Sequence, residues 1–212
     1  PTMQILNRWP RLGARLLVAL LAVAACDDGT GPDATKDTVR PPTNFKPVRL
    51  QQGAPGLAAT QLQFWARYDR DREVRLFFKP RAGKTDSTEF LKFKVPSRSL
   101  LRDATGRTFA NQDSVLITIA VPDPTKFLVI FEPSGLRFSA SRPAELEFSL
   151  AESDDDLDGD GDDDADDDLK NVDLWRQETP TSVWERIQSL VIESLEKIEA
   201  DILGFTGYAV AI

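Results

Sequence analysis

Short stretches in which apolar and polar residues alternate are the feature that most constrains the fold of this chain. In the first of them, Leu62, Phe64 and Ala66 alternate with glutamine, tryptophan and arginine. Similar stretches occupy residues 74–79, 91–95, 115–121, 127–131 and 145–150, separated by turns rich in Gly, Pro and Asp. A side-chain period of two is that of a β-strand with one buried face. The chain is therefore predicted to be all-β and to form an antiparallel β-sandwich of two packed sheets.

The connection between the first two stretches is polar and short. Residues 69–72, Asp-Arg-Asp-Arg, follow Tyr68 and precede Val74. This pattern is interpreted as a hairpin turn, which would make the two strands neighbours in one sheet.

The segment over residues 183–203 is ambiguous on local grounds. Apolar residues recur there at helical spacing, at Trp184, Ile187, Val191, Leu195, Ile198 and Ile202. Residues 183–187 and 197–202 also alternate as strands do. The local pattern leaves both a helix and strands open.

Several motifs between residues 90 and 212 carry a resemblance to a known module. They are 131–138 followed by 142–146, 94–96 followed by 99–100, the pairs 174–175 and 183–184, and 204–211. Together they resemble the signature strands of the ZU-five domain, the β-sandwich module of ankyrins and netrin receptors, and of its bacterial relatives. The Gly-Ala pair of the family's Val-Pro-x-Gly-Ala-Leu turn is replaced here by Arg98-Ser99. The resemblance implies a β-sandwich and strands, not a helix, over 183–203.

Some relatives in that family cleave their own chain between the Phe and the Ser of a His-Phe-Ser motif. The resemblance places Gly204, Phe205 and Thr206 at these positions. Because Gly204 replaces the histidine, no base activates the Thr206 hydroxyl, and self-cleavage is not expected. Thr206 and Tyr208 are instead predicted to belong to a closing strand.

The amino-terminal segment has the parts of a secretory signal. Arginines at positions 8, 11 and 15 precede an apolar run over residues 16–22, which leads into Val23-Ala24-Ala25-Cys26. The run is shorter than the roughly 20 residues that span a bilayer, so a trimmed signal is favoured over a retained helix. The last four residues resemble the lipobox of bacterial lipoproteins, which implies that Cys26 is lipidated and begins the mature chain. The expected location is a membrane surface that faces the periplasm or the cell exterior.

These features divide the chain into three parts. Residues 1–25 form the predicted signal peptide, and residues 26–44 form the lipidated cysteine and a flexible tether rich in polar residues, Gly and Pro. Residues 45–212 form the predicted β-sandwich domain, which a long acidic loop interrupts at 152–170. The single cysteine is assigned to the lipid, so no disulfide is expected within the chain.

Composition excludes several classes of function. The chain contains no histidine, which excludes Ser-His-Asp and Cys-His catalysis and His-based zinc sites. From Cys26 onward, 23 basic residues face 34 acidic ones, and eleven of the acids lie between positions 154 and 168. The rest of the domain is neutral, so binding of nucleic acid is not expected. No isolated pair of carboxylates stands out as a glycosidase pair, and no enzymatic activity is predicted.

The acidic insertion has two interpretations. Counted from Asp156, carboxylates fall at positions 1, 3, 5, 9 and 12 and a glycine at position 6, which is the spacing of calcium loops. The candidate metal ligands are Asp156, Asp158, Asp160, Asp162, Asp164 and Asp167, with Asp162 contributing its backbone carbonyl. An aspartate run also matches such spacings by chance, and it is then a solvated loop. Calcium is therefore the candidate cofactor, and a solvated acidic loop is the alternative.

Two functions follow from the sequence. The first is a lipid-anchored, non-catalytic module of the cell envelope with a structural or interaction role, whose partners are the membrane, through Cys26, and an envelope protein. The second is a carbohydrate-binding module, in which exposed aromatic residues contact a glycan. Trp65, Trp175 and Trp184 are candidates, and Trp65 is the most prominent because it shares its strand face with two glutamines and an arginine. Exposure of all three tryptophans would favour glycan binding, and burial would remove it.

Overall fold

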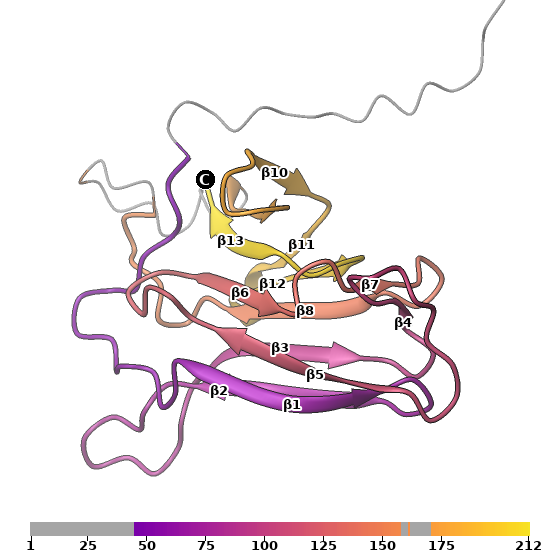
Figure 1. Ribbon diagram of the computed structural model, residues 1–212. Helices are drawn as coiled ribbons and strands as arrows, with labels where there is room; N and C mark the ends of the chain where they lie inside the picture. Colours follow the sequence, from indigo (N-terminus) through magenta and orange to yellow (C-terminus); the bar gives the residue numbers. More distant parts are fainter. Residues whose placement is uncertain (1–44, 158–160, 162–170) are drawn as a thin grey trace, which may run out of the picture. The chain divides into compact units, whose positions relative to one another are not determined.

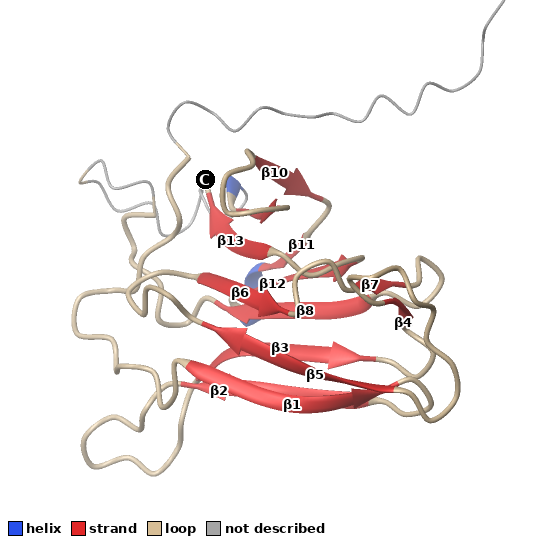
Figure 2. Ribbon diagram, in the orientation of Figure 1, coloured by secondary structure: helices blue, strands red, loops and turns tan. Residues whose placement is uncertain are grey.

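In the computed structural model, two antiparallel sheets pack against each other, as Figure 1 shows. The structure describes residues 45–157, 161 and 171–212, all of which belong to one unit over Asp37–Ile212. Strands dominate the regular structure of these residues (Figure 2), with a short 3-10 turn, η2 (Glu193–Leu195), near the end of the chain. The predicted all-β sandwich is confirmed.

Antiparallel pairing defines the order of the strands in each sheet. The first sheet has the order β1 (Gln61–Arg67), β5 (Ser114–Ala120), β6 (Leu128–Glu132), β13 (Gly207–Ala211), β9 (Asp173–Gln177) and β10 (Trp184–Ile187). The second has the order β11 (Leu190–Ile192), β12 (Lys197–Ile202), β8 (Ala144–Ser149), β3 (Glu89–Val95) and β2 (Arg72–Phe77). A two-stranded ribbon of β4 (Leu100–Arg102) and β7 (Arg137–Phe138) accompanies them. We call the first two the six-stranded and the five-stranded sheet.

The core lies between these two sheets and is dominated by phenylalanine rings. The ring of Phe93, on β3, lies 4.9 Å from that of Phe131, on β6, measured between centroids. The same ring also contacts Phe64, on β1, and Phe205. All four side chains are buried, and truncation of such a residue to alanine costs about 3–5 kcal/mol. The apolar positions of the alternating stretches therefore face the core.

The interpretation of residues 69–72 as a hairpin turn is wrong. β1 pairs with β5 in the six-stranded sheet, whereas β2 pairs with β3 in the five-stranded sheet. The turn therefore carries the chain from one sheet to the other. It is held by the segment that follows β3, because the Ser97 N–H donates to Asp71 Oδ1 at 2.7 Å and the Arg98 N–H donates to the Tyr68 carbonyl at 2.5 Å. Alternation along a strand sets its buried face but does not encode its neighbour.

The segment over residues 183–203 is formed by β10, β11, η2 and β12, so the helical alternative is wrong and the strand prediction is confirmed. Six consecutive residues of β12 pair with β8, and Ile198, Ala200 and Ile202 are buried against the core. Pairing with a strand about 50 residues earlier decides the conformation that the local pattern left open.

Part of the predicted organisation lies outside the described residues. This applies to the signal peptide at 1–25, to Cys26 with the tether through residue 44, and to most of the acidic insertion. Among residues 45–157, 161 and 171–212, no helix has the length and apolar character needed to cross a bilayer.

Candidate functional site

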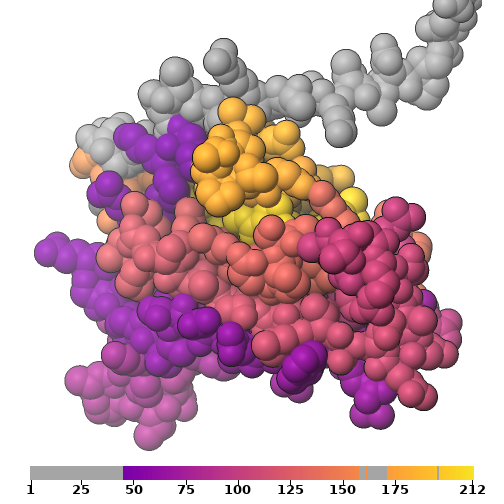
Figure 3. All heavy atoms as spheres, viewed as in Figure 1, coloured from indigo at the N-terminus to yellow at the C-terminus, as the bar shows by residue number. Residues whose placement is uncertain are grey.

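Trp65 lies on the outer face of the six-stranded sheet and is 62% exposed. Its cross-strand partner on β5 is Leu116, which is 40% exposed on the same face. Ile130, on β6, adds a third exposed apolar residue to this face. We call this surface, made by the outward residues of β1, β5 and β6, the Trp65 face. Atoms of β5 and β6, salmon in Figure 3, lie on the side of the molecule that faces the viewer there.

Planar polar groups flank Trp65 along its own strand. The side-chain amide of Gln63 donates from Nε2 to Thr118 Oγ1 at 3.1 Å. On the other side, the Arg67 guanidinium donates two hydrogen bonds of 2.9 Å to the Asp69 carboxylate. That pairing lowers the pKa of Asp69, so both groups stay charged and balance each other. The immediate surroundings of Trp65 are therefore polar but without net charge.

The other two candidate tryptophans are covered. Trp175, on β9, is 3% exposed, and Trp184, on β10, is half-buried. The ring of Phe45 stacks on Trp184 with 5.1 Å between centroids and meets Trp175 edge-on at 5.4 Å. The structure thus separates the three tryptophans that the sequence grouped together. Trp65 is the member of that group that stays on the surface.

In the described part of the acidic insertion, a hydrogen bond joins Asp156 to the backbone of Gly161. The backbone N–H of Gly161 donates to Asp156 Oδ2 at 3.0 Å, and Gly161 has a φ of 100°, which favours glycine. Asp158, Asp160, Asp162, Asp164 and Asp167 lie outside the described residues. Within the described ones, no group of three or more acidic or thiol side chains is placed to hold a metal ion. The calcium interpretation therefore stays a prediction.

The environment of Thr206 is that of a packed strand end. The Thr206 hydroxyl is buried and donates to the Gly207 carbonyl at 3.3 Å. The neighbouring Tyr208 hydroxyl donates to the carbonyl of Gly204 at 2.5 Å. A Cβ at Gly204 would lie only 2.8 Å from Arg137 Nη1, so the guanidinium occupies the space that a histidine side chain would need. The closing strand is confirmed for Tyr208, which lies in β13, whereas Thr206 lies directly before that strand and outside it.

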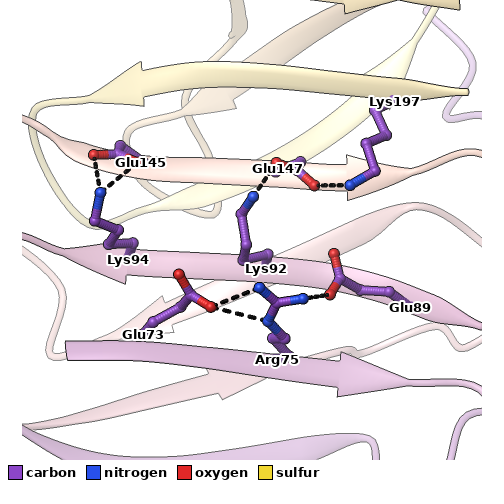
Figure 4. A network of polar contacts seen from close by, with 8 residues as sticks. All are labelled: Glu73, Arg75, Glu89, Lys92, Lys94, Glu145, Glu147 and Lys197. Atoms are coloured by element: carbon purple, nitrogen blue, oxygen red, sulfur yellow. Dashed lines mark hydrogen bonds and ion pairs between the residues drawn. The ribbon is translucent and has the colours of Figure 1, made fainter. Parts of the chain in front are cut away.

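Sequence reasoning did not identify the charged network on the outer face of the five-stranded sheet, drawn in Figure 4. Its centre is Glu147, on β8, which is only 6% exposed and accepts hydrogen bonds from Lys92, on β3, and from Lys197, on β12, the latter at 2.5 Å. Burial acts to raise the pKa of Glu147, but the hydrogen bonds from Lys197 and Lys92 outweigh it and lower that pKa. The alternating lysines of β3 and glutamates of β8 were the signal in the sequence. It could be used only once these strands were known to be neighbours.

A second feature that the sequence did not reveal is a cleft of about 880 Å³ along β12. Its lining includes Arg176, on β9, Ile187, on β10, Tyr208, on β13, and the consecutive residues 199–203. Arg176 is paired with Glu185 at 3.1 Å, while its Nε is buried and has no acceptor among the described residues. The cleft lies beside residues of β12 that β11 does not pair with, and no local pattern in the sequence marks where β11 ends.

Comparison with known proteins adds no assignment to this geometry. No protein-family model, curated protein or solved structure matches the chain. Its function has to be inferred from the side chains that the fold leaves accessible.

Proposed function

We propose that this chain is a lipid-anchored, non-catalytic module of the cell envelope that binds a partner through the Trp65 face. The observation that carries the proposal is Trp65 itself, a large aromatic residue left mostly exposed on a rigid sheet. The lipobox-like residues 23–26 and the polar tether support the anchoring. The lack of histidine supports a binding role over a catalytic one.

Tryptophan is over-represented among the residues that dominate binding energies, because it offers a large apolar area at little conformational cost. Leu116 enlarges the apolar surface beside it, and both side chains project from strands that pair over seven residues. A protein partner of ordinary interface size covers roughly 800 Å² on each side, so it would cover the whole of this three-stranded face and extend beyond it.

Carbohydrate binding is the second candidate function, and the groups that flank Trp65 favour it. A sugar ring can lay its apolar C–H face on the indole while the amide of Gln63 and the guanidinium of Arg67 meet its hydroxyls. The charge balance between Arg67 and Asp69 suits a neutral glycan better than an acidic one. Trp175 and Trp184 do not contribute, since Phe45 covers them.

The anchor is tested by expressing the full chain in bacteria and partitioning the membranes with detergent. The native chain is expected in the detergent phase, labelled by an alkyne-tagged fatty acid. The Cys26→Ser variant is expected in the aqueous phase without label. Equal partitioning of the two would show that Cys26 is not the site of anchoring.

The Trp65 face is tested by placing a photo-crosslinking residue at the exposed Gln61 of the anchored chain in cells. Crosslinking to a protein of defined mass is expected for an interaction module. Affinity electrophoresis on neutral polysaccharides tests the glycan instead, and retardation is expected there for the carbohydrate module. In either assay Trp65→Ala should weaken binding by about 2 kcal/mol, roughly thirty-fold. Val183→Ala, a change at an exposed residue outside the Trp65 face, serves as the control. If neither a crosslink nor retardation is observed, binding through the Trp65 face is refuted.

A further inference from the structure

We propose that the cleft along β12 binds an extended peptide, which adds to the five-stranded sheet as a strand in line with β11. This site uses none of the residues of the Trp65 face, so the inference is independent of the function proposed above. It rests on the strand register, the lining of the cleft and the charges at its rim.

β11 covers only part of the neighbouring edge of β12. Its three residues, from Leu190 to Ile192, pair with residues 197–199, whereas β8 pairs with β12 on the other side as far as Ile202. Residues 200–202 therefore have a strand neighbour on one side alone within the described part of the chain. The connection from β10 does not extend β11 here, since residues 188 and 189 belong to no strand, although both line the cleft.

The backbone of Asp201 is directed into the cleft. In an antiparallel ladder, successive residues direct their N–H and C=O groups to opposite neighbours. The Leu150 N–H donates to the Glu196 carbonyl at 2.6 Å, so residues 198, 200 and 202 face β8. Glu199 faces Leu190 of β11, and Asp201 faces the same way beyond the end of β11. An added strand can supply the carbonyl and the N–H that complete this pair.

The lining shows that the cleft follows the edge of the strand. Five consecutive residues, 199–203, contribute to it. A pocket on one face of a strand would meet alternate residues only, because successive side chains point to opposite faces. Five residues span roughly 16 Å, which is the length of a short strand. The volume of about 880 Å³ also lies in the range of ligand sites.

The two sides of the cleft specify alternating side chains in the guest. Toward the core, the partly exposed Ile187 presents apolar surface, and the buried Ile202 and Tyr208 lie behind it. Arg176 is neutralised by Glu185, so inward guest residues are apolar. Toward solvent, the rim carries Glu199 and Asp201.

The charge of the rim makes the outward guest residues basic. A guest residue opposite Asp201 lies on the same face as that carboxylate, where opposite charges on paired strands attract. Leu190, 57% exposed at the end of β11, can cover the stem of a lysine or arginine at that position. The occupant is thus an extended segment in which basic and apolar residues alternate.

The probe is the capped hexapeptide Lys-Val-Lys-Val-Lys-Val, titrated into the full chain in detergent by calorimetry. Saturable binding of one peptide per chain is expected. The same peptide methylated on the backbone nitrogens of its three lysines keeps every side chain but loses the N–H groups that would face β12, and it should bind at least ten-fold more weakly. The hexapeptide with glutamate in place of lysine should also bind at least ten-fold more weakly.

Protein variants and hydrogen exchange complete the test. Asp201→Lys should weaken binding of the basic peptide and strengthen binding of the acidic one. Asp86→Lys, in the loop between β2 and β3, should change neither affinity. If Asp201→Lys fails to fold, hydrogen exchange of the Asp201 backbone amide in the native chain tests the proposal instead. The bound peptide should slow that exchange. Equal affinity for the methylated peptide would overturn strand addition and indicate a site for other ligands. Absence of binding by the basic peptide, or unchanged exchange at Asp201, would overturn the proposal as well.

Discussion

The guanidinium of Arg137 fills the space beside Gly204, with Nη1 only 2.8 Å from where a Cβ would stand. The Leu136 carbonyl lies 3.1 Å from the same point, so the backbone just before β7 also limits relaxation. Arg137 is itself held by Glu178 at 2.5 Å. Glycine at position 204 is therefore a packing requirement of this fold.

Gly204→Ala should lower the free energy of unfolding by about 1–3 kcal/mol, the usual cost of overpacking a tight site. Urea denaturation followed by tryptophan fluorescence measures it. Gly56→Ala, where nothing lies within 4 Å of the added carbon, should cost little and is the control. Arg137→Ala in the Gly204→Ala background should recover part of the loss, and strict additivity of the two changes would contradict the contact.

Glu147→Gln should destabilise the protein by about 1–2 kcal/mol, because it removes a charged acceptor from two lysines. The pKa of Glu147 is lowered in the folded state, so its contribution is present above the ordinary value of 4.5 and is lost as the pH falls through the folded value. Urea midpoints at neutral pH and at pH 3 measure this. The difference in urea midpoint between the native and variant proteins should be smaller at pH 3 than at neutral pH. Glu145→Gln, at a more exposed pair with Lys94, should show a smaller effect, and an equal one would count against burial as the cause.

The phenol of Tyr208 should lose its proton only at a pH well above the usual range for tyrosine. Burial raises its pKa from 10.0 to about 12, so the neutral phenol is the form that the fold accommodates. The associated stability is present below pH 10 and is lost as the pH rises through about 12, a total of about 3 kcal/mol. Ultraviolet absorbance of tyrosinate should contain a step near pH 12 that is missing from Tyr208→Phe. A wild-type curve without that step would contradict the burial of the Tyr208 phenol.

Calorimetric titration of the chain with calcium decides between the two interpretations of the acidic insertion. Saturable binding of about one ion, lost in a variant with Asp156, Asp158 and Asp160 all changed to Ala, is the result expected of a calcium loop. Bound calcium should then also raise the free energy of unfolding by mass action. Weak, unsaturable heat in both proteins would leave the insertion as a solvated spacer.

Alternation along the chain determined most of the strands and their buried faces. Phe64, Phe93 and Phe131 were assigned to the core from that pattern and are all buried there. The absence of histidine likewise excluded whole classes of catalysis without any structure. These properties are local or compositional, which is why a single sequence can express them.

Tertiary structure alone decided which strands are neighbours and which side chains stay accessible. Residues 69–72 look like a hairpin turn, yet the two strands that they join enter different sheets. Trp65 and Trp175 looked alike as candidates, but Phe45 covers one of them and nothing described covers the other. Lys92 and Glu147 meet across 55 positions of sequence. The physical reason is common to all three cases: the period of a strand is set by its own backbone, whereas its partners are set by packing between segments far apart in the chain.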